Sequence, residues 1–569
     1  MAGTDRGGIP DTDDAPDVAG APLDLLLADA TRGGWRALAP RTSALRFAGG
    51  LARRPGRLVR RGRGLAAELG RIAFGTSTVA PEPRDRRFTD DAWSGNPFLR
   101  RTLQAYLAAS HTADALVGDA ELTETDALRV STVVSNTADA LAPSNNPLLN
   151  PRALKAVVDS GGANLVRGVR NLARDVAAPP RIPRMVEPDA FAVGETVGTS
   201  PGTVVARTPV FELISYAPVT EQVHETPLLI VPPTINKFYV VDLAPGRSLV
   251  EYLVGRGHQV FVMSWRNPDV RHADWGFDTY GEAILTALRT CREVTGAPRT
   301  SVLSMCSGGI LTSMVLAHLA ARGELDTIAA AALSVAVLDQ ADTGQAGALL
   351  TPAVAEAAVR ASAARGYLDG RSLAEVFAWL RPNDLVWNYW VDSYLLGRSP
   401  KPFDVLFWNA DTTRMTAALH RDFIDLARRN ALVDGSVTML GTPVDLSAVT
   451  VDTYVTAGAT DHLCPWQRCY ATTRLFGGKS RFVLSSGGHI ASIVNPPPGA
   501  RSRYQVSDHT PADPDGWAAG AEQVDGSWWP DFDAWLTAHA GPEVSAPTTP
   551  STTDHPALCD APGTYVHVS

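Results

Sequence analysis

The stretch Ser301-Val-Leu-Ser-Met-Cys-Ser-Gly-Gly309 decides the fold that we expect for this chain. Its first part, up to Met305, is a short apolar run that predicts a buried strand, and the residues from Gly308 to Ala321 predict a helix. Cys306 therefore lies at a sharp turn from strand to helix. Such a turn is typical of the nucleophile elbow G-x-S-x-G, here with cysteine replacing serine and Ser304 replacing the first glycine.

A thiol suits this position chemically. The helix that starts near Gly308 directs its positive end toward Cys306, which favours the thiolate form of the side chain. The backbone N–H of Ser307 lies at the same helix start and can donate to a developing oxyanion. The alternative is that Cys306 is a buried core cysteine, which is a common role for this residue type.

Apolar runs before and after the turn complete the same pattern. The runs from Pro227 to Val231 and from Gln259 to Met263 precede it, and a helical stretch around Tyr280 to Cys291 follows the second run. Further runs that predict strands are Ile328 to Val337, Val451 to Val455 and Arg481 to Leu484. Since strands alternate with helices, the sequence predicts an α/β protein with a doubly wound, mostly parallel sheet, the α/β-hydrolase fold.

Two later residues complete a candidate catalytic triad with Cys306. In this fold an acid follows a late strand and a histidine follows the last strand. Asp461 follows the first of the last two predicted strands, and His489 lies in a glycine-flanked loop after the second. The order Cys306, Asp461, His489 is the one that the fold requires. The alternatives are a turn or helix-cap role for Asp461, His462 as a competing base, and an ordinary loop role for His489.

A second oxyanion donor is expected in the loop after the strand that ends at Val231. That loop reads Pro232-Pro-Thr-Ile235, and its prolines have no backbone N–H to offer. The N–H of Thr234 or of Ile235 is therefore the candidate that complements Ser307.

The N-terminal part of the chain divides into two expected regions. Residues 1–80 comprise an acidic, Pro/Gly-rich start that we expect to be disordered, followed by an arginine-rich segment from Arg41 to Arg71. This segment is interpreted either as a basic amphipathic helix that meets an anionic surface or as a solvated helix face. Residues 81–200 show apolar residues at helical spacing and predict a mainly helical domain.

The rest of the chain, residues 201–540, is the expected catalytic domain. Its strand pattern is interrupted at about 340–445 by an aromatic-rich insertion, which we expect to form a lid. Trp387 and Trp408 are candidates for lining an apolar substrate passage there, although plain core packing is the alternative. Residues 541–569 form a Pro/Thr/Ser-rich tail that reads as a linker except at its end.

Composition limits the function classes. A net charge of −9 argues against a general preference for nucleic acid. The five cysteines are sparse and odd in number, which suggests thiols in a reducing cytoplasm and neither a disulfide framework nor a metal site. No secretion signal and no apolar run long enough to cross a membrane is present in the sequence.

Several longer motifs resemble one family, the polyhydroxyalkanoate synthases, over roughly residues 80 to 540. Within that family the chain is most similar to the single-subunit, medium-chain-length type, class II, as indicated by Tyr394 to Gly397, Asp411-Thr-Thr-Arg414 and Pro562-Gly-Thr-Tyr-Val-His567. Ser304 departs from the family, which usually has glycine there. The motifs that carry the resemblance are Asp85-Arg-Arg-Phe-Thr-Asp-Asp-Ala-Trp93, Val231-Pro-Pro-Thr-Ile-Asn-Lys-Phe-Tyr239, Ser264-Trp-Arg-Asn-Pro-Asp269, Met305-Cys-Ser-Gly-Gly309, Arg381-Pro-Asn-Asp-Leu-Val-Trp-Asn-Tyr389, Phe403-Asp-Val-Leu-Phe-Trp-Asn409, Asp461-His-Leu-Cys-Pro-Trp466 and Gly488-His-Ile490.

The resemblance implies polymerisation of (R)-3-hydroxyacyl-CoA into storage polyester, with release of CoA and an acyl thioester on Cys306. It implies no cofactor, since CoA is part of the substrate and a product. The implied partners are the growing polyester, the granule surface, granule-associated proteins and a second copy of the chain, in the cytoplasm at the granule surface. The alternatives are a thioesterase or polyester depolymerase of the same fold, or a non-catalytic granule-binding protein. Acyl chain length, oligomeric state, lid position and the base for the 3-hydroxyl stay open.

Overall fold

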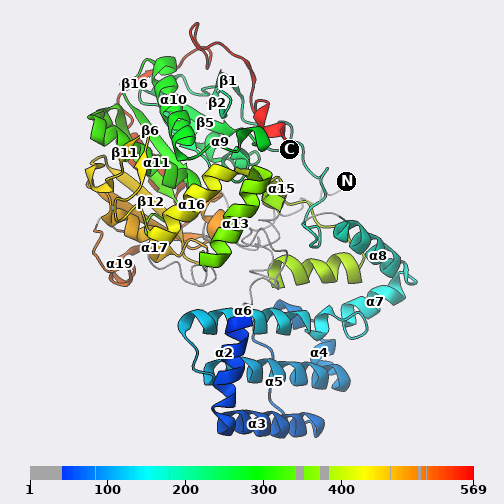
Figure 1. Ribbon diagram of the computed structural model, residues 1–569. Helices are drawn as coiled ribbons and strands as arrows, with labels where there is room; N and C mark the ends of the chain where they lie inside the picture. The colour runs from blue at the N-terminus through cyan, green and yellow to red at the C-terminus, as the bar shows by residue number, and fades with distance from the viewer. Residues whose placement is uncertain are drawn as a thin grey trace.

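The computed structural model describes residues 41–83, 85–177, 180–340, 352–371, 383–461, 463–497, 502–507 and 509–569. An α/β domain with a large twisted sheet and a separate stack of helices make up the molecule (Figure 1). The sheet has 11 strands in the order β15-β14-β13-β12-β7-β6-β4-β5-β2-β1-β17. The non-consecutive neighbours are joined by helical crossovers, which confirms the predicted doubly wound α/β-hydrolase architecture.

The centre of the sheet is parallel and buried. Its strands are buried at nearly every position, which explains why they read as apolar runs and not as alternating patterns. The predicted strand at 328–337 stops earlier, because Val335 turns into a left-handed conformation with φ 46°. The parallel strands are β4 (Leu228–Val231), β5 (Val260–Trp265), β6 (Thr300–Met305), β7 (Ile328–Ser334), β12 (Thr453–Gly458) and β13 (Ser480–Ser485).

Antiparallel strands extend both edges of the sheet. On one edge β2 pairs with β5, β1 with β2 and β17 with β1. On the other edge β14 pairs with β13 and β15 with β14. These strands are β1 (Gly202–Arg207), β2 (Phe211–Tyr216), β14 (Arg503–Ser507), β15 (Glu522–Asp525) and β17 (Cys559–Asp560), and a separate ladder joins β3 (Gln222–His224) to β16 (Glu543–Ser545).

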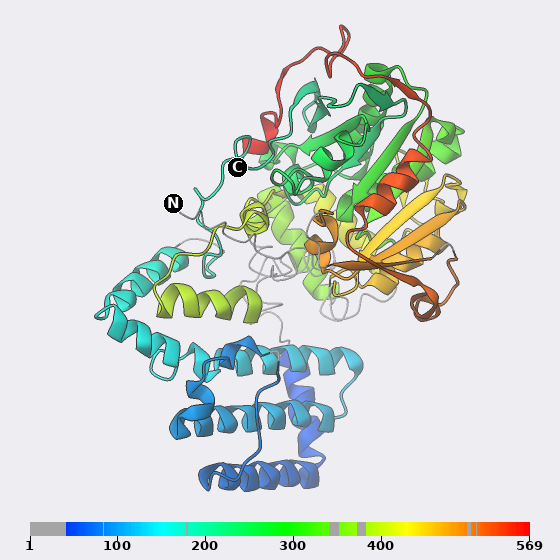
Figure 2. The same cartoon turned by 180° about the vertical axis from the view of Figure 1, so that it is seen from behind.

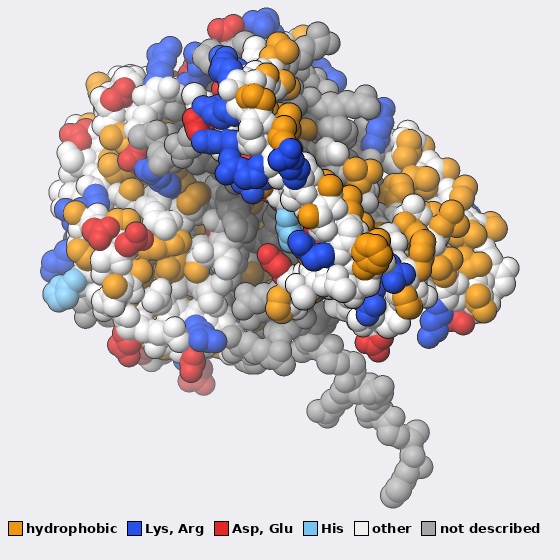
Figure 3. All heavy atoms as spheres, turned by 90° about the horizontal axis from the view of Figure 1, so that it is seen from below, with side chains coloured by type: hydrophobic (Ala, Val, Ile, Leu, Met, Phe, Trp, Pro, Cys, Tyr) orange, Lys and Arg blue, Asp and Glu red, His pale blue; other side chains and the backbone are white. Residues whose placement is uncertain are grey.

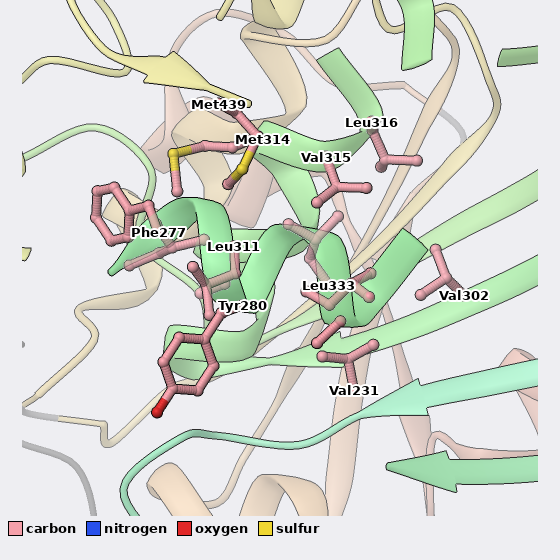
Figure 4. Packing of buried hydrophobic residues seen from close by; sticks show 14 of the residues in the cluster. Val231, Phe277, Tyr280, Val302, Leu311, Met314, Val315, Leu316, Leu333 and Met439 are labelled. Carbon is pink, nitrogen blue, oxygen red and sulfur yellow. The ribbon is translucent and has the colours of Figure 1, made fainter. Parts of the chain in front are cut away.

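Helices cover both faces of the sheet. On one face α11 is buried along its length from Cys306 to Leu319, and it packs with α10 against strands β4, β6 and β7 (Figure 4). Because this helix contacts protein on every side, it is apolar all round instead of amphipathic. The helices of that face are α10 (Phe277–Thr295), α11 (Cys306–Arg322) and α16 (Ala417–Arg429), and those of the opposite face include α9 (Leu249–Val254), α17 (Trp466–Ala471), α18 (His489–Ile493) and α20 (Trp529–Thr537).

The predicted helical N-terminal region is present as a stack of helices. Helix α5 begins after Asn96, whose side chain accepts from two backbone N–H groups, with proline at the next position. Leu99, Leu103 and Leu107 recur at helical spacing and are buried inside the stack. The helices are α2 (Arg41–Ala52), α3 (Pro55–Ala73), α4 (Ala92–Gly95), α5 (Pro97–Asp119), α6 (Glu124–Ala140), α7 (Pro151–Asp159) and α8 (Ala163–Val176).

Part of the arginine-rich segment pairs within this stack. Arg61 Nε lies 2.7 Å from Asp119 Oδ2, and Arg57 Nη2 lies 2.8 Å from Glu121 Oε1, while Arg54 also pairs with Glu121. Other arginines of α3 stay exposed, and on this side of the molecule Lys and Arg side chains gather beside hydrophobic ones (Figure 3). The segment is therefore helical as predicted, although part of its charge is satisfied internally. The acidic start that we expect to be disordered, residues 1 to about 22, lies outside the described residues.

The insertion contacts both parts of the molecule. Helices α13 and α16 pack on the α/β core, whereas the π-helical turn η9 packs on α8. Asn164 Nδ2 donates to the Leu395 carbonyl at 2.8 Å, and Tyr394 Oη donates to Asp175 at 3.0 Å. In both views the segment of η8 and η9 lies between the helical stack and the α/β domain (Figures 1 and 2). The elements described here are α13 (Pro352–Arg365), β8 (Tyr367–Leu368), η8 (Asn383–Trp387), η9 (Trp390–Leu395), α15 (Asp404–Ala410) and β9 (Met415–Thr416).

The end of the C-terminal tail, which the sequence excepts from the predicted linker, packs on the catalytic domain. Strand β17 joins the edge of the main sheet, and Val566 is buried in the core. The backbone N–H groups of Thr564 and Tyr565 donate to the fully buried Glu212 carboxylate at 2.8 and 2.9 Å. A buried carboxylate needs such donors, so the tail completes the catalytic domain and the predicted boundary at 540 is too early.

Candidate active site

The elbow has the strained geometry that its sequence predicts. Cys306 is the first residue of α11 and has φ 49°, a left-handed conformation that costs free energy for a residue with a side chain. A Cβ added to Gly308 would lie 2.6 Å from the Pro232 carbonyl oxygen, so only glycine fits there. At Gly309 an added Cβ would lie 2.7 Å from the Ala336 side chain. The Cys306 side chain is thereby presented at the end of β6, with 9% of the residue exposed.

Ser304 fits the elbow without crowding it. The residue is fully buried, and its Oγ donates to the Ala332 carbonyl oxygen of the neighbouring strand at 3.2 Å. The serine side chain that replaces the usual glycine is thus accommodated, and it adds a hydrogen bond between β6 and β7.

Asp461 and His489 form a buried pair beyond the ends of β12 and β13. Asp461 Oδ2 lies 2.7 Å from His489 Nδ1, and both side chains are almost completely buried. The other carboxylate oxygen accepts the backbone N–H groups of Leu463 at 2.9 Å and Cys464 at 3.0 Å. An ionised carboxylate only accepts, so the Nδ1–H donates and the second ring nitrogen, Nε2, is left to act as base or acid.

The two loops approach closely because of a glycine. A Cβ at Gly458 would lie 2.7 Å from the Gly487 carbonyl oxygen, so a larger residue would push the acid loop away from the histidine loop. His489 itself differs from the expected loop position: it is the first residue of the short helix α18, with Gly488 immediately before it. His462, the competing base, lies outside the described residues.

The electrostatics make the imidazole a stronger base. Burial disfavours the charged ring, but the Asp461 carboxylate, the Cys464 side chain and a hydrogen bond with Cys306 together raise the pKa of His489 well above its ordinary value. Because Cys306 contributes to this pKa, the elbow thiol lies near the imidazole, and the structure brings the three predicted triad residues together.

The candidate oxyanion donors divide into two groups. The Thr234 N–H donates to Ser307 Oγ at 3.0 Å and is therefore already engaged. The Ser307 N–H belongs to the first turn of α11, where backbone donors have no acceptor within the helix. The Ile235 N–H makes no hydrogen bond to the part of the chain that the structure describes. Ser307 and Ile235 are consequently the donors that remain free for a substrate oxygen.

The two tryptophans predicted for a substrate passage occupy different environments. Trp387 lines a cavity of about 1130 Å³ between the N-terminal helices and the insertion, together with Arg87, Arg152 and Tyr389. Trp408 is 1% exposed, lies outside that cavity, and donates its indole N–H to the Lys237 carbonyl at 2.7 Å. The triad residues do not line this cavity, so a passage role for either tryptophan stays a prediction.

Sequence reasoning missed Cys464. Its sulfur, an Asp461 carboxylate oxygen and a His489 ring nitrogen all lie within 4.8 Å of one another, and each residue is buried. The contact with the Cys469 thiol, burial and the Asp461 charge raise the pKa of the Cys464 thiol well above its ordinary value. The signal in the sequence was its position three residues after the acid.

The sheet order, the strained cysteine elbow and the buried acid–imidazole pair define a protein of the α/β-hydrolase fold. A family model described as "alpha/beta hydrolase fold" matches residues 227–496, and one described as "Poly-beta-hydroxybutyrate polymerase (PhaC) N-terminus" matches residues 84–253. No helix of the described residues is long and apolar enough to cross a membrane.

Curated relatives specify the family. Poly(3-hydroxyalkanoate) polymerase 2 of Ectopseudomonas oleovorans is 43% identical over 88% of this chain and 90% of its own length, and polymerase 1 of that organism is 45% identical over 88% and 89%. The poly(3-hydroxyalkanoate) polymerase subunit PhaC of Cupriavidus necator is 40% identical over 87% of this chain and 85% of its own length. The chain belongs to the poly(3-hydroxyalkanoate) polymerase family.

Proposed function

We propose that this protein polymerises (R)-3-hydroxyacyl-CoA into polyhydroxyalkanoate and releases CoA, with Cys306 as nucleophile. The observation that carries the proposal is the buried Asp461–His489 pair, with its 2.7 Å hydrogen bond and its imidazole near the thiol at the elbow. Family membership supplies the substrate class, since the relatives are named as poly(3-hydroxyalkanoate) polymerases.

The first half-reaction loads the enzyme. His489 Nε2 accepts the Cys306 proton, and the thiolate attacks the acyl-CoA thioester carbonyl. The developing oxyanion accepts from the Ser307 and Ile235 N–H groups, which the fold holds in place before the substrate arrives. The tetrahedral intermediate expels CoA, which takes the proton from His489, and leaves an acyl thioester on Cys306. One thioester replaces another, so this exchange is close to balanced in free energy.

The second half-reaction extends the polymer. The 3-hydroxyl of one hydroxyacyl unit attacks a second acyl thioester, an ester bond forms, and the thiol leaves with the proton of the hydroxyl. His489 is the base that the geometry favours for this step. One Asp461 oxygen is engaged by His489 and the other by two backbone N–H groups, which leaves the carboxylate poorly placed to reach a substrate hydroxyl.

Burial of the site supports an alcohol acceptor over water. Asp461 is 5% exposed, His489 3% and Cys306 9%, so the acyl-enzyme would form in a site with little room for bulk water. A thioesterase of the same fold needs water at that point. The thioesterase alternative therefore predicts a solvent-exposed elbow, whereas Cys306 is only 9% exposed.

We also propose that the protein works in the cytoplasm at the surface of polyester granules, as a homodimer and with granule-associated proteins. The support comes from the helical stack, where Val158 is 80% exposed, Val166 73% and Val169 67%, close to basic side chains. An apolar surface with flanking cations suits contact with a polyester surface that carries anionic groups.

The activity test uses the full-length protein with short- and medium-chain 3-hydroxyacyl-CoA. Free thiol reports CoA release, and chloroform-soluble polyester reports chain growth. The proposal expects both products, and neither from Cys306→Ala. CoA release with free 3-hydroxy acid and no polymer would establish the thioesterase reading, and inactivity with intact granule binding would establish the non-catalytic one.

The surface test compares two charge insertions. Val169→Asp places a carboxylate on the exposed face of α8, and Val219→Asp places one at a similarly exposed site, 70%, on the catalytic domain. Co-sedimentation with artificial polyester granules should weaken for the first and not for the second. Equal binding by both variants and the parent would refute the proposal that α8 contacts the granule. Light scattering of the full-length protein would test the proposed homodimer by its molecular mass.

A further inference from the structure

Cys464 is a buried nucleophilic side chain that the proposed reaction leaves unused. Its sulfur converges with an Asp461 oxygen and a His489 nitrogen, all within 4.8 Å of one another. The Cys306 thiol interacts with the same imidazole from the elbow. One carboxylate, one imidazole and the Cys464 thiol thus converge on a buried point.

This donor set matches the coordination preferences of Zn²⁺ and related soft divalent cations. Zinc binds cysteine sulfur at about 2.3 Å and histidine nitrogen or carboxylate oxygen at about 2.0 to 2.2 Å, in tetrahedral geometry. Ligand atoms in a tetrahedral site of one sulfur and two lighter donors lie about 3.4 to 3.6 Å apart, so a contraction of about 1 Å closes the present triangle. Magnesium and calcium prefer oxygen ligands only, and the thiol and imidazole disfavour them.

The local backbone holds these ligands in register. Asp461 Oδ1 accepts the N–H groups of Leu463 and Cys464 at 2.9 and 3.0 Å, so carboxylate and thiol belong to one tight turn. His489 reaches the turn through its 2.7 Å hydrogen bond with the other oxygen. A cation would replace that hydrogen bond and bind both partners at once, with little movement of either loop.

We propose that Zn²⁺, or another soft divalent cation such as Cd²⁺, binds Asp461, Cys464 and His489 and reversibly inhibits the enzyme. Binding releases the Cys464 proton to solvent, moves the imidazole proton from Nδ1 to Nε2, and forms a metal–sulfur bond; water completes the coordination. The inhibitory consequence rests on the proposed function, because with the cation on Nδ1 the proton occupies Nε2, which then cannot accept the proton of Cys306. Metal binding itself does not rest on it.

Binding is tested without turnover, using Co²⁺ as an optical probe of zinc sites. Full-length Cys306→Ala protein in a phosphine reductant is titrated with Co²⁺, and the near-ultraviolet thiolate-to-cobalt absorption is recorded. The expected result is a band that saturates at one equivalent and that disappears in Cys306→Ala/Cys464→Val. Cys306→Ala/Cys559→Ser serves as the matched control, since Cys559 is a half-buried thiol of the distant edge strand β17.

Inhibition is then tested with Zn²⁺ on proteins that keep Cys306. Each rate is divided by the metal-free rate of the same variant, so a change of basal activity does not enter. Cys464→Val should need about tenfold more Zn²⁺ or more for half-inhibition than the parent or Cys559→Ser, and a chelator should restore activity.

Three results would overturn the proposal. These are a cobalt band that survives Cys464→Val, equal zinc sensitivity of Cys464→Val and the parent, and inhibition that a thiol reductant reverses while a chelator does not, which would mark a disulfide. If the protein made no polymer but the cobalt band behaved as expected, the proposed function would fail while the metal site stood.

Discussion

Replacement of Asp461 by asparagine tests the acid–imidazole pair most directly. The carboxylate makes one hydrogen bond to His489 at 2.7 Å and two to backbone N–H groups at 2.9 and 3.0 Å. Asparagine has one acceptor oxygen, and facing it toward the two N–H groups keeps two bonds of three. Its NH₂ group then faces His489 Nδ1, which must become an acceptor. The proton moves to Nε2, the nitrogen that has to take the proton of Cys306.

The expected loss follows from this tautomer change. In a serine triad with the wrong histidine tautomer the rate falls by about 10⁴-fold. Because a thiol ionises more readily than a hydroxyl, the rate of this enzyme should fall by about 10³- to 10⁴-fold. This corresponds to about 4 to 5.5 kcal/mol of transition-state stabilisation. Because the thiolate must then form without help, the residual rate should rise by about tenfold per pH unit below the thiol pKa.

The assay is initial CoA release at saturating substrate, from pH 6 to pH 9. Asp242→Asn is the matched control: Asp242 is also buried and also accepts hydrogen bonds on both oxygens, from Ser200 and Ser248, so the same substitution there reports the structural cost of replacing a buried carboxylate outside the triad. Thermal unfolding checks that both variants fold. A loss smaller than about tenfold for Asp461→Asn in a folded protein would refute the role of the pair.

Further predictions concern the elbow and pH. Gly308→Ala should lower the thermal midpoint and the yield of folded protein, since its Cβ would lie 2.6 Å from a backbone carbonyl oxygen, whereas Gly95→Ala in open space should not. Ser304→Ala should cost about 1 kcal/mol of stability in denaturant unfolding, through loss of a buried 3.2 Å hydrogen bond, with little effect on CoA release. The raised pKa of His489 stabilises the folded state below the unfolded-state pKa, and this contribution is lost as pH rises through the folded-state pKa. The thermal midpoint of the parent should therefore fall across that alkaline range, and that of Asp461→Asn should fall less.

Local sequence patterns predicted much of the fold. The central strands are buried on both faces, so hydrophobic runs alone located β4 to β7, β12 and β13 to within a few residues. The elbow was recognisable because steric limits at a left-handed residue demand small neighbours such as Gly308 and Gly309. The acid and the histidine followed from strand order, since parallel strands end at the same edge of the sheet.

Other features depend on contacts between distant segments, which no local pattern records. The tail was predicted as a linker except at its end, but no local pattern showed that Thr564 and Tyr565 satisfy the buried carboxylate of Glu212. The sequence could not choose between Thr234 and Ile235 as the second oxyanion donor. The structure separates them, because the Thr234 N–H already donates to the Ser307 hydroxyl.

The sequence by itself determined the type of fold and the order of the candidate triad, because burial and backbone strain act residue by residue along the chain. Only the tertiary structure decided which groups meet across the sheet. The convergence of Cys464 with Asp461 and His489, and the docking of η9 on α8, arise when loops and helices from separate parts of the chain pack together. Periodicity carries information about which face of an element is buried, but not about its partner on that face.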